Sequence, residues 1–242
     1  MCVDKEHRRK GIGSGLLERS EQAVREGGYS EIRAGAGADY IMPGVPTARR
    51  YFEAENESLS PMVDGTAGDF FTKRGYRHSW DCNCFDMRLP LKQFKSEKYC
   101  IGDTIGNITY RWAVPEERDK VCACTDDAYP EFTRYYQEER LYTPQNGTRV
   151  LAAVSDGEIV GTLLVGTEDT AGRTGSLSCT AVKHAFRGKH IAVNLVTVGT
   201  RYLKNSGMEE AYLGYTYSGL DHLYGYAGYK ISVYYMMAVK RL

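Results

Sequence analysis

The stretch VKHAFRGKHIA spans residues 182–192, and a related stretch, VDKEHRRKGIG, spans residues 3–13. The two align without a gap at an offset of 179 residues, and the same offset relates Gly28 to Gly207. Agreement of this length at a single offset indicates an internal repeat, which sets the domain organisation before any residue is considered singly.

A second landmark of the repeat follows each of these stretches. The sequence FFTKRGY at residues 70–76 is echoed by HLYGYAGY at residues 222–229, at an offset of 153 residues. The first copy therefore carries extra residues between its two landmarks. They lie around residues 40–46 and 53–68, whose glycine, proline and polar content predicts loops and turns.

The second copy contains a fuller series of predicted elements than the first. A Ser-Asp-Gly-Glu turn between two β-branched runs predicts a hairpin, and apolar residues at helical spacing from Ile191 predict a helix that ends at Gly207. We expect an α/β (α+β) fold with a mixed, mostly antiparallel sheet flanked by helices. The predicted strands are residues 107–112, 149–154, 159–165, 176–182, 211–217 and 229–239, and further helices are predicted within 115–141 and 219–225.

The first copy lacks the elements that precede the repeated stretch in the second copy, because Val3 follows Met1 almost directly. We therefore expect two tandem copies: an incomplete back half at residues 1–92, a linker at residues 93–106, and a complete domain at residues 107–242. A half-domain of this length has a marginal core. We expect that Met1 is internal to a longer natural protein; the alternative is that another molecule completes the half-domain, for example in a homodimer.

Each copy places a basic, glycine-containing loop directly before a predicted helix. The N–H groups at a helix start have no internal partner, and the helix dipole adds partial positive charge, so such a loop can hold a pyrophosphate. The second loop has His190 where the first has Gly11, which favours the first loop as a phosphate binder. The candidate residues are Arg8, Arg9, Lys10, Gly11, Ile12 and Gly13 in the first copy and Arg187, Gly188, Lys189, His190, Ile191 and Ala192 in the second.

The pattern Q/R-x-x-G-x-G/A between a strand and a helix, followed by L-Y-x-x-x-G-F, resembles the GCN5-related N-acetyltransferase (GNAT) family. The resemblance extends over both copies, as in tandem members of the mycothiol synthase type. It implies acetyl-CoA as co-substrate, with its pyrophosphate on the basic loops, and transfer of the acetyl group to a primary amine, which we expect to belong to a small molecule.

The resemblance also implies roles for single residues of the second copy. The backbone of Ala181 and Val182 would bind pantetheine, the N–H of Val182 would stabilise the oxyanion, and Tyr224 would protonate the departing thiolate. The general base is left open: it is one of three carboxylates, Glu209, Glu210 and Asp221, or a water molecule that relays the proton.

Two positions depart from the family pattern. The first copy has Phe71 where the second has Tyr224, and phenylalanine has no proton to give. In the second copy, Tyr217 stands where the family often has asparagine. The complete C-terminal copy is therefore the expected catalyst, and the first copy is a cofactor-binding or structural partner. Two alternatives stay open: a non-catalytic acyl-CoA-binding or scaffolding module, and an active site at the first loop of a longer chain.

Composition limits the remaining classes. The 242 residues include 31 Lys+Arg and 31 Asp+Glu, and the absence of a long run of like charge disfavours a nucleic-acid binder. No stretch approaches the roughly 20 apolar residues of a membrane span, and the start lacks a secretory signal, so we expect a cytoplasmic protein.

The cysteine count of seven is odd, and the pairs Cys82/Cys84 and Cys122/Cys124 lack zinc-ligand spacing. We therefore expect no metal and cysteines that face a core.

Overall fold

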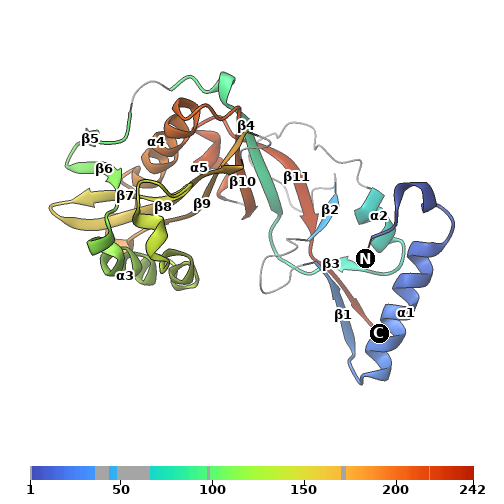
Figure 1. Ribbon diagram of the computed structural model, residues 1–242. Helices are drawn as coiled ribbons and strands as arrows, with labels where there is room; N and C mark the ends of the chain where they lie inside the picture. The colour runs from blue at the N-terminus through green and yellow to red at the C-terminus, as the bar shows by residue number, and fades with distance from the viewer. Residues whose placement is uncertain (1, 36–43, 48–65, 97–98, 170–172, 218) are drawn as a thin grey trace. The chain divides into compact units, whose positions relative to one another are not determined.

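Two units divide the chain in the computed structural model, which describes residues 2–35, 44–47, 66–96, 99–169, 173–217 and 219–242 (Figure 1). Unit 1 comprises Met1–Glu53, Pro61–Cys84 and Val233–Leu242, and unit 2 comprises Ala54–Ser60 and Phe85–Ser232. The C-terminal residues thus fold with the N-terminal segment, although their sequence belongs to the second copy.

Unit 2 is built on a mixed sheet flanked by helices. Its strands are β4 (Cys84–Pro90), β5 (Thr104–Ile105), β6 (Ile108–Trp112), β7 (Thr148–Ser155), β8 (Glu158–Asp169), β9 (Thr174–Val182), β10 (Glu210–Tyr217) and the first residues of β11 (Lys230–Met236). Their order along the sheet is β11-β4-β10-β9-β8-β7-β6-β5. Neighbours from β5 to β9 are antiparallel, whereas β10 runs parallel to β9. The expected mixed, mostly antiparallel α/β fold is confirmed.

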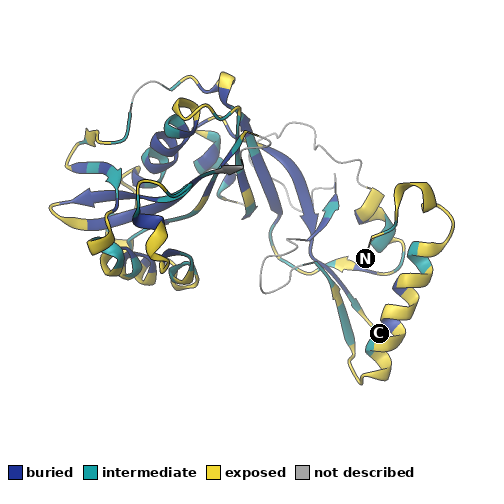
Figure 2. Cartoon of the chain, viewed as in Figure 1, coloured by how far each residue is buried: buried dark blue, intermediate teal, exposed yellow. Residues whose placement is uncertain are grey.

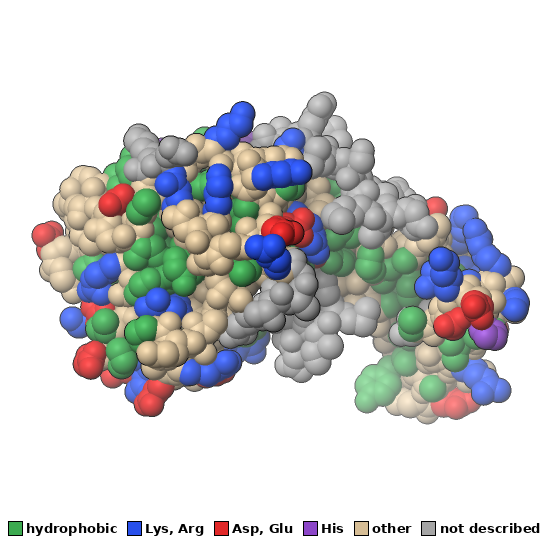
Figure 3. Space-filling view, turned by 45° about the horizontal axis from the view of Figure 1, so that its top comes forward, with side chains coloured by type: hydrophobic (Ala, Val, Ile, Leu, Met, Phe, Trp, Pro, Cys, Tyr) green, Lys and Arg blue, Asp and Glu red, His purple; other side chains and the backbone are tan. Residues whose placement is uncertain are grey.

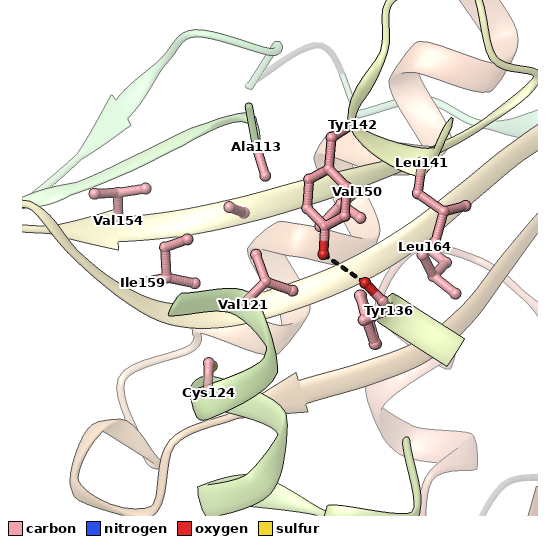
Figure 4. Packing of buried hydrophobic residues seen from close by; sticks show 11 residues of the cluster. Ala113, Val121, Cys124, Tyr136, Leu141, Tyr142, Val150, Val154, Ile159 and Leu164 are labelled. Carbon is pink, nitrogen blue, oxygen red and sulfur yellow. Dashed lines mark hydrogen bonds between the residues drawn. The ribbon is translucent and has the colours of Figure 1, made fainter. Parts of the chain in front are cut away.

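Helices cover both faces of this sheet. Leu164 of β8 packs in a cluster with residues of α3, whereas its neighbour Leu163 lies against Gly199 of α4, because successive side chains of a strand face opposite sides. Figure 4 shows the cluster on the α3 face. The helices of unit 2 are η2 (Leu91–Gln93), η3 (Pro115–Glu117), α3 (Arg118–Ala128), η4 (Pro130–Tyr136), η5 (Glu139–Tyr142), η6 (His184–Phe186), α4 (Ile191–Asn205) and α5 (Asp221–Gly225).

Local signals in the sequence account for several of these elements. The hairpin between β7 and β8 turns at Asp156 and Gly157, whose φ angles of 48° and 79° are those of the predicted tight turn. Pro115 begins η3, as expected of a residue suited to a first helical turn. Residues 115–141, where one or two helices were expected, form α3 together with short 3-10 helices.

Unit 1 is smaller. It contains η1 (Lys5–His7), α1 (Ile12–Glu26), β1 (Glu31–Ala34), β2 (Val45–Thr47), α2 (Thr66–Thr72), β3 (Arg77–His78) and β12 (Ala238–Arg241). The strands β1 and β3 flank β12 in an antiparallel sheet, and β2 pairs with the end of β11. Residues 2–4, expected as the stub of a strand, have no regular structure. Of the loops predicted at residues 40–46 and 53–68, residues 40–43 and 53–65 lie outside the described residues. Residues 45–46 belong to β2 and residues 66–68 to α2, so the prediction was wrong there.

The two copies of the repeat exchange their last strands. β4 ends the first copy and lies in the sheet of unit 2 between β10 and β11, while β12 ends the second copy and lies in unit 1. The single strand predicted at residues 229–239 is accordingly two strands, β11 and β12. The boundaries 1–92, 93–106 and 107–242 stay a prediction about the copies, and residues 93–106, expected as a linker, include β5.

The backbone reproduces the internal repeat closely. α1 and α4 each contain 15 residues, and each is preceded by a short 3-10 helix at the same offset. Both helices end at a glycine in the left-handed region, with φ of 78° at Gly28 and 81° at Gly207. The later landmarks agree as well, since Gly75 and Gly228 have φ of 84° and 95°.

The two equivalent helices differ in how far they are buried. Ile12 and Leu16 of α1 are 43% and 42% exposed, whereas their counterparts Ile191 and Leu195 in α4 are 1% and 0% exposed. Figure 2 shows α1 exposed along most of its length. In unit 2 the corresponding face packs on Gly161 of β8, a strand that precedes the repeated stretch.

Charged side chains of both signs lie on the surface in view. Figure 3 shows Lys and Arg side chains scattered among acidic and neutral ones on the face in view. None of the helices in the described part of the chain combines the length and the apolarity that crossing a membrane requires.

Candidate active site

The loop before α4 forms an open backbone cradle. Gly188 and His190 both lie in the left-handed region, with φ of 78° and 58°, and turn the chain into the helix. The N–H of Asn194 makes the first bond of α4, to the His190 carbonyl at 3.0 Å. The N–H groups of residues 191–193 therefore have no helical partner and point out of the helix start, where they suit an anion.

The loop before α1 has the same backbone. Arg9 and Gly11 occupy the equivalent positions with φ of 63° and 80°, and the Gly15 N–H bonds the Gly11 carbonyl at 3.0 Å. His190 thus takes the conformation that Gly11 takes in the first copy, so the difference between the loops lies in the side chain and not in the cradle. A residue other than glycine pays roughly 1–2 kcal/mol for this conformation.

This strain leads to a first prediction, the substitution His190→Gly. We expect it to leave the affinity for acetyl-CoA, the co-substrate that the sequence resemblance implies, within about twofold of wild type. We also expect it to change the free energy of unfolding by less than about 1 kcal/mol, because the relief of strain is offset by greater freedom of the unfolded chain. Calorimetric titration and urea unfolding measure the two quantities. A large loss of affinity would instead assign the imidazole a direct contact with the cofactor.

The first arginine of each loop is held by backbone carbonyls. The Nε of Arg187 donates to Val182 O at 3.4 Å, and its guanidinium also donates to Ala128 O at the end of α3 at 3.1 Å. Arg8 repeats the first of these contacts, with Val3 O at 3.1 Å. Both arginines therefore brace the loop. Lys189, whose ammonium lies 4.7 Å from the Phe186 ring centre, is exposed and remains available to a phosphate.

The sheet opens beside this loop. β9 and β10 pair only through Thr174–Ser176 and Glu210–Tyr212. Beyond this point β10 is bound from its other side, because Asp86 of β4 accepts hydrogen bonds from the Tyr215 N–H at 2.9 Å and from the Tyr212 hydroxyl at 2.7 Å. The later residues of β9 are therefore left with one unpaired edge.

The alternation of the β8–β9 ladder decides which predicted residue faces the opening. The Lys183 N–H donates to Val160 O at 3.0 Å. In an antiparallel pair such bonds alternate, so the backbone of Ala181 is turned toward β8 and that of Val182 is turned away from it. The Val182 N–H is thus available on the open edge, whereas the Ala181 N–H is committed to the ladder.

A bulge in β9 adds a residue that the sequence analysis missed. The register passes from Thr162/Ala181 to Leu164/Ser178, so Cys179 and Thr180 share one partner position, and Cys179 has a φ of 53°. The Thr180 hydroxyl lies 3.4 Å from the Tyr224 hydroxyl. Thr180 precedes Val182 by two residues, and this spacing is the only sequence signal that could have suggested it.

Tyr224 lies in α5 and is 7% exposed. Burial raises the pKa of its hydroxyl above the ordinary value, so the group is protonated at neutral pH and can donate a proton. Its ring meets Tyr229 edge to face, and the Tyr229 hydroxyl is 2.9 Å from that of Thr200 in α4. In unit 1 the equivalent Phe71 packs edge to face on Tyr76, with no proton to offer.

The three candidate bases have different surroundings. Glu209 binds Arg173 at 2.6 Å, and Glu210 is paired with Arg88, so both are engaged in ion pairs. Asp221 is 3% exposed and accepts the Gly219 N–H through one oxygen, while its other oxygen has no hydrogen-bond partner among the described residues. Of the three, Asp221 is the one whose unbonded carboxylate oxygen is buried, among the residues that the structure describes.

The cysteines show no metal-binding arrangement. Cys84 and Cys124 are fully buried in β4 and α3, as expected of cysteines that face a core. Across the residues that the structure describes, no three potential metal-ligating side chains gather together.

Comparison with known proteins identifies the family. The model of the acetyltransferase (GNAT) family matches residues 1–52 and 110–227, which is more than half of the chain. The chain belongs to the GNAT acetyltransferase family. A comparison with curated proteins finds no match.

Several solved structures share the GNAT fold. A glucosamine N-acetyltransferase region of a fungal multi-domain GH3 β-N-acetylglucosaminidase is 22% identical with a TM-score of 0.66. The alignment covers 98% of this chain and 29% of that chain. A tandem GNAT protein of the clavulanic acid biosynthesis pathway is 16% identical with a TM-score of 0.67, over 99% of this chain and 73% of that one. A GNAT from Sphaerobacter thermophilus is 19% identical with a TM-score of 0.63, over 99% and 70%. The tandem GNAT architecture is thereby confirmed.

Proposed function

We propose that unit 2 transfers the acetyl group of acetyl-CoA to the primary amine of a small molecule. The observation that carries this proposal is the buried Tyr224 hydroxyl beside Thr180, at the point where β9 and β10 have separated. We place acetyl-CoA with its phosphates at the helix-start cradle and its thioester at the open edge of β9. An acid at the position of Tyr224 lies along this path.

The parts of acetyl-CoA match the donors along this path. The unpaired N–H groups at the start of α4 and the Lys189 ammonium suit the pyrophosphate. The Val182 N–H suits an amide carbonyl of the pantetheine arm. The thioester carbonyl then falls near Thr180, and we propose that the Thr180 N–H, in place of the Val182 N–H expected from the resemblance, stabilises the oxyanion that forms when the amine attacks. Tyr224 gives its proton to the thiolate that leaves.

Direct transfer is favoured over an acyl-enzyme intermediate. Cys179 is the cysteine in the bulge of β9, but burial raises the pKa of its thiol to about 11. The thiol is therefore protonated at neutral pH and is a poor nucleophile. The amine thus attacks the thioester carbonyl itself, and Asp221 is the carboxylate that we propose takes its proton.

The acceptor is proposed as a small amine, and an amino sugar is the first to test, because one similar structure is described as a glucosamine N-acetyltransferase region. The test incubates the chain with acetyl-CoA and separate amines, including glucosamine, and follows thiol release together with the mass of the acetylated product. Acetyl-CoA binding without acetylation of any amine would favour the alternative function, a non-catalytic acyl-CoA-binding or scaffolding module.

Specific observations favour a non-catalytic role for unit 1. Its loop has the cradle backbone, yet Phe71 replaces the acid and the apolar face of α1 around Ile12 and Leu16 is exposed. We therefore propose that unit 1 supports unit 2 and does not itself transfer acetyl groups.

A second prediction separates the two loops by charge reversal. We expect Lys189→Glu to weaken acetyl-CoA binding by about tenfold or more, because it replaces a charge-assisted contact with repulsion. Lys10→Glu is the matched control at the same repeat position and should change affinity by no more than about twofold. Calorimetric titration measures both affinity and stoichiometry. Equal losses in the two variants, or two sites per chain, would contradict the assignment of binding to unit 2.

A further inference from the structure

Tyr136 connects the α3 side of the sheet to the bulge of β9. It ends η4, its side chain is fully buried, and its hydroxyl donates to the Cys179 carbonyl at 2.6 Å. Figure 4 shows Tyr136 within the cluster on this face, with Tyr142 directed toward it. Cys179 is the residue of β9 that lies in the left-handed region, so this bond holds a backbone conformation that the chain does not otherwise favour.

The same peptide carries the N–H of Thr180. The described peptide bonds are trans, so the Cys179 carbonyl and the Thr180 N–H point in opposite directions. Neither Cys179 nor Thr180 has a partner in the register with β8. The hydrogen bond from Tyr136 therefore fixes the direction of the Thr180 N–H at the point where the β8–β9 register is interrupted.

The direction is the useful one for acetyl transfer. Tyr136 lies on the α3 face, whereas Tyr224 packs with Tyr229, whose hydroxyl meets Thr200 of α4 on the other face. The Thr180 N–H thus points away from Tyr136, and the Thr180 side chain already meets the Tyr224 hydroxyl. The Thr180 N–H and the acid, the Tyr224 hydroxyl, therefore lie close together.

We propose that Tyr136 is a positioning residue for acetyl transfer, whose hydroxyl orients the Cys179–Thr180 peptide so that the Thr180 N–H faces the thioester carbonyl. This inference rests on the proposed function of unit 2. Tyr136 touches no substrate; it acts through the peptide that does. The Thr180 N–H stabilises the transition state only if it is directed at the developing oxyanion. A wrongly oriented N–H therefore lowers the rate of the chemical step more than it lowers the affinity for acetyl-CoA.

The structure offers a matched control. Tyr142 is equally buried in the same cluster and its hydroxyl donates to the Tyr136 carbonyl at 2.7 Å, but it makes no bond to β9 among those described. Tyr136→Phe and Tyr142→Phe each remove one buried hydroxyl and one hydrogen bond. A loss of general stability affects both variants, whereas a loss of peptide orientation affects only Tyr136→Phe.

The experiment compares kcat and KM of the two variants on the best amine of the panel. We expect Tyr136→Phe to lower kcat by about tenfold or more with the KM for acetyl-CoA within about twofold, and Tyr142→Phe to keep kcat within about twofold. Equal kcat values in the two variants would overturn the inference, as would a change confined to KM.

A second readout needs no acceptor and separates this inference from the proposed function. Protein labelled with 15N-threonine is titrated with acetyl-CoA and, separately, with CoA, and the Thr180 amide resonance is followed. We expect a shift specific to acetyl-CoA that is retained in Tyr142→Phe and lost in Tyr136→Phe. The same shift in both variants overturns the inference. Specific shifts without acetylation of any amine would overturn the proposed function while supporting the role of Tyr136.

Discussion

Tyr224→Phe is expected to lower kcat for acetyl transfer by about a hundredfold or more while the affinity for acetyl-CoA stays within about twofold. General acid catalysis by a positioned side chain contributes about 10²- to 10⁴-fold, and the substitution removes only the proton donor. The ring, which packs edge to face on Tyr229, is retained. Steady-state kinetics at saturating acetyl-CoA and calorimetric titration measure the two quantities.

The control is Tyr226→Phe, two residues along the chain. Tyr226 is 77% exposed, so its hydroxyl is in water and its loss should leave kcat within about twofold. If Tyr224→Phe turned over at the rate of Tyr226→Phe, the assignment of Tyr224 as the acid would be wrong.

With Tyr224 as the acid, activity should fall at alkaline pH, when its hydroxyl loses its proton. Tyr224 acts in its protonated form, and burial raises the pKa of its hydroxyl, so the active form persists through neutral and mildly alkaline pH. The loss of activity that belongs to this group should appear only above about pH 10, the ordinary pKa of tyrosine. A wild-type limb near pH 7 would therefore belong to another group, such as the amine or its base.

Lys240→Met is expected to lower the free energy of unfolding of unit 1 by about 3 kcal/mol. Glu21 of α1 is 6% exposed, and both of its carboxylate oxygens accept from the Lys240 ammonium, at 2.9 and 2.8 Å. Removal of one partner of a buried ion pair costs about 3–5 kcal/mol, and the partial exposure of Lys240 together with the remaining, longer ion pair from Arg25 to Glu21 places the effect at the lower end. Urea unfolding followed by circular dichroism measures the change.

Two variants test the reason for this effect. Arg25 also approaches Glu21, at 3.6 Å, but is half exposed, so Arg25→Met should cost about 0.5 kcal/mol. The double variant Glu21→Gln with Lys240→Met removes both charges and should recover most of the loss. A double variant no more stable than Lys240→Met alone would show that packing of β12, and not the ion pair, holds the exchanged strand.

The local features of both copies were predictable because short stretches of sequence encode them. The left-handed glycines that end α1 and α4, the turn at Asp156 and Gly157, and the basic loops each depend on a few consecutive residues. Because the sequence is repeated, the helix and loop predicted in one copy also predicted the helix and loop of the other. The family resemblance, and not local conformation, singled out Tyr224 through its place in a motif, with Phe71 as its counterpart.

The sequence did not predict what depends on contacts between distant residues. The exchange of β4 and β12 was missed because a strand carries no local mark of its partner, and any edge of suitable register can accept it. The bulge at Cys179 was missed because a left-handed cysteine is unfavourable alone and is held by Tyr136, 43 residues earlier.

By itself, then, the sequence determined the repeat and the helix-start cradles, because backbone conformation over a few residues follows from side-chain size, charge and glycine content. The role of Tyr224 as proton donor is what the family resemblance implies, and it stays a prediction. The tertiary structure alone decided that Val182 faces the opening while Ala181 faces β8, and that Thr180 meets Tyr224. These facts depend on the register of paired strands, and a shift of one residue would reverse which groups face the site.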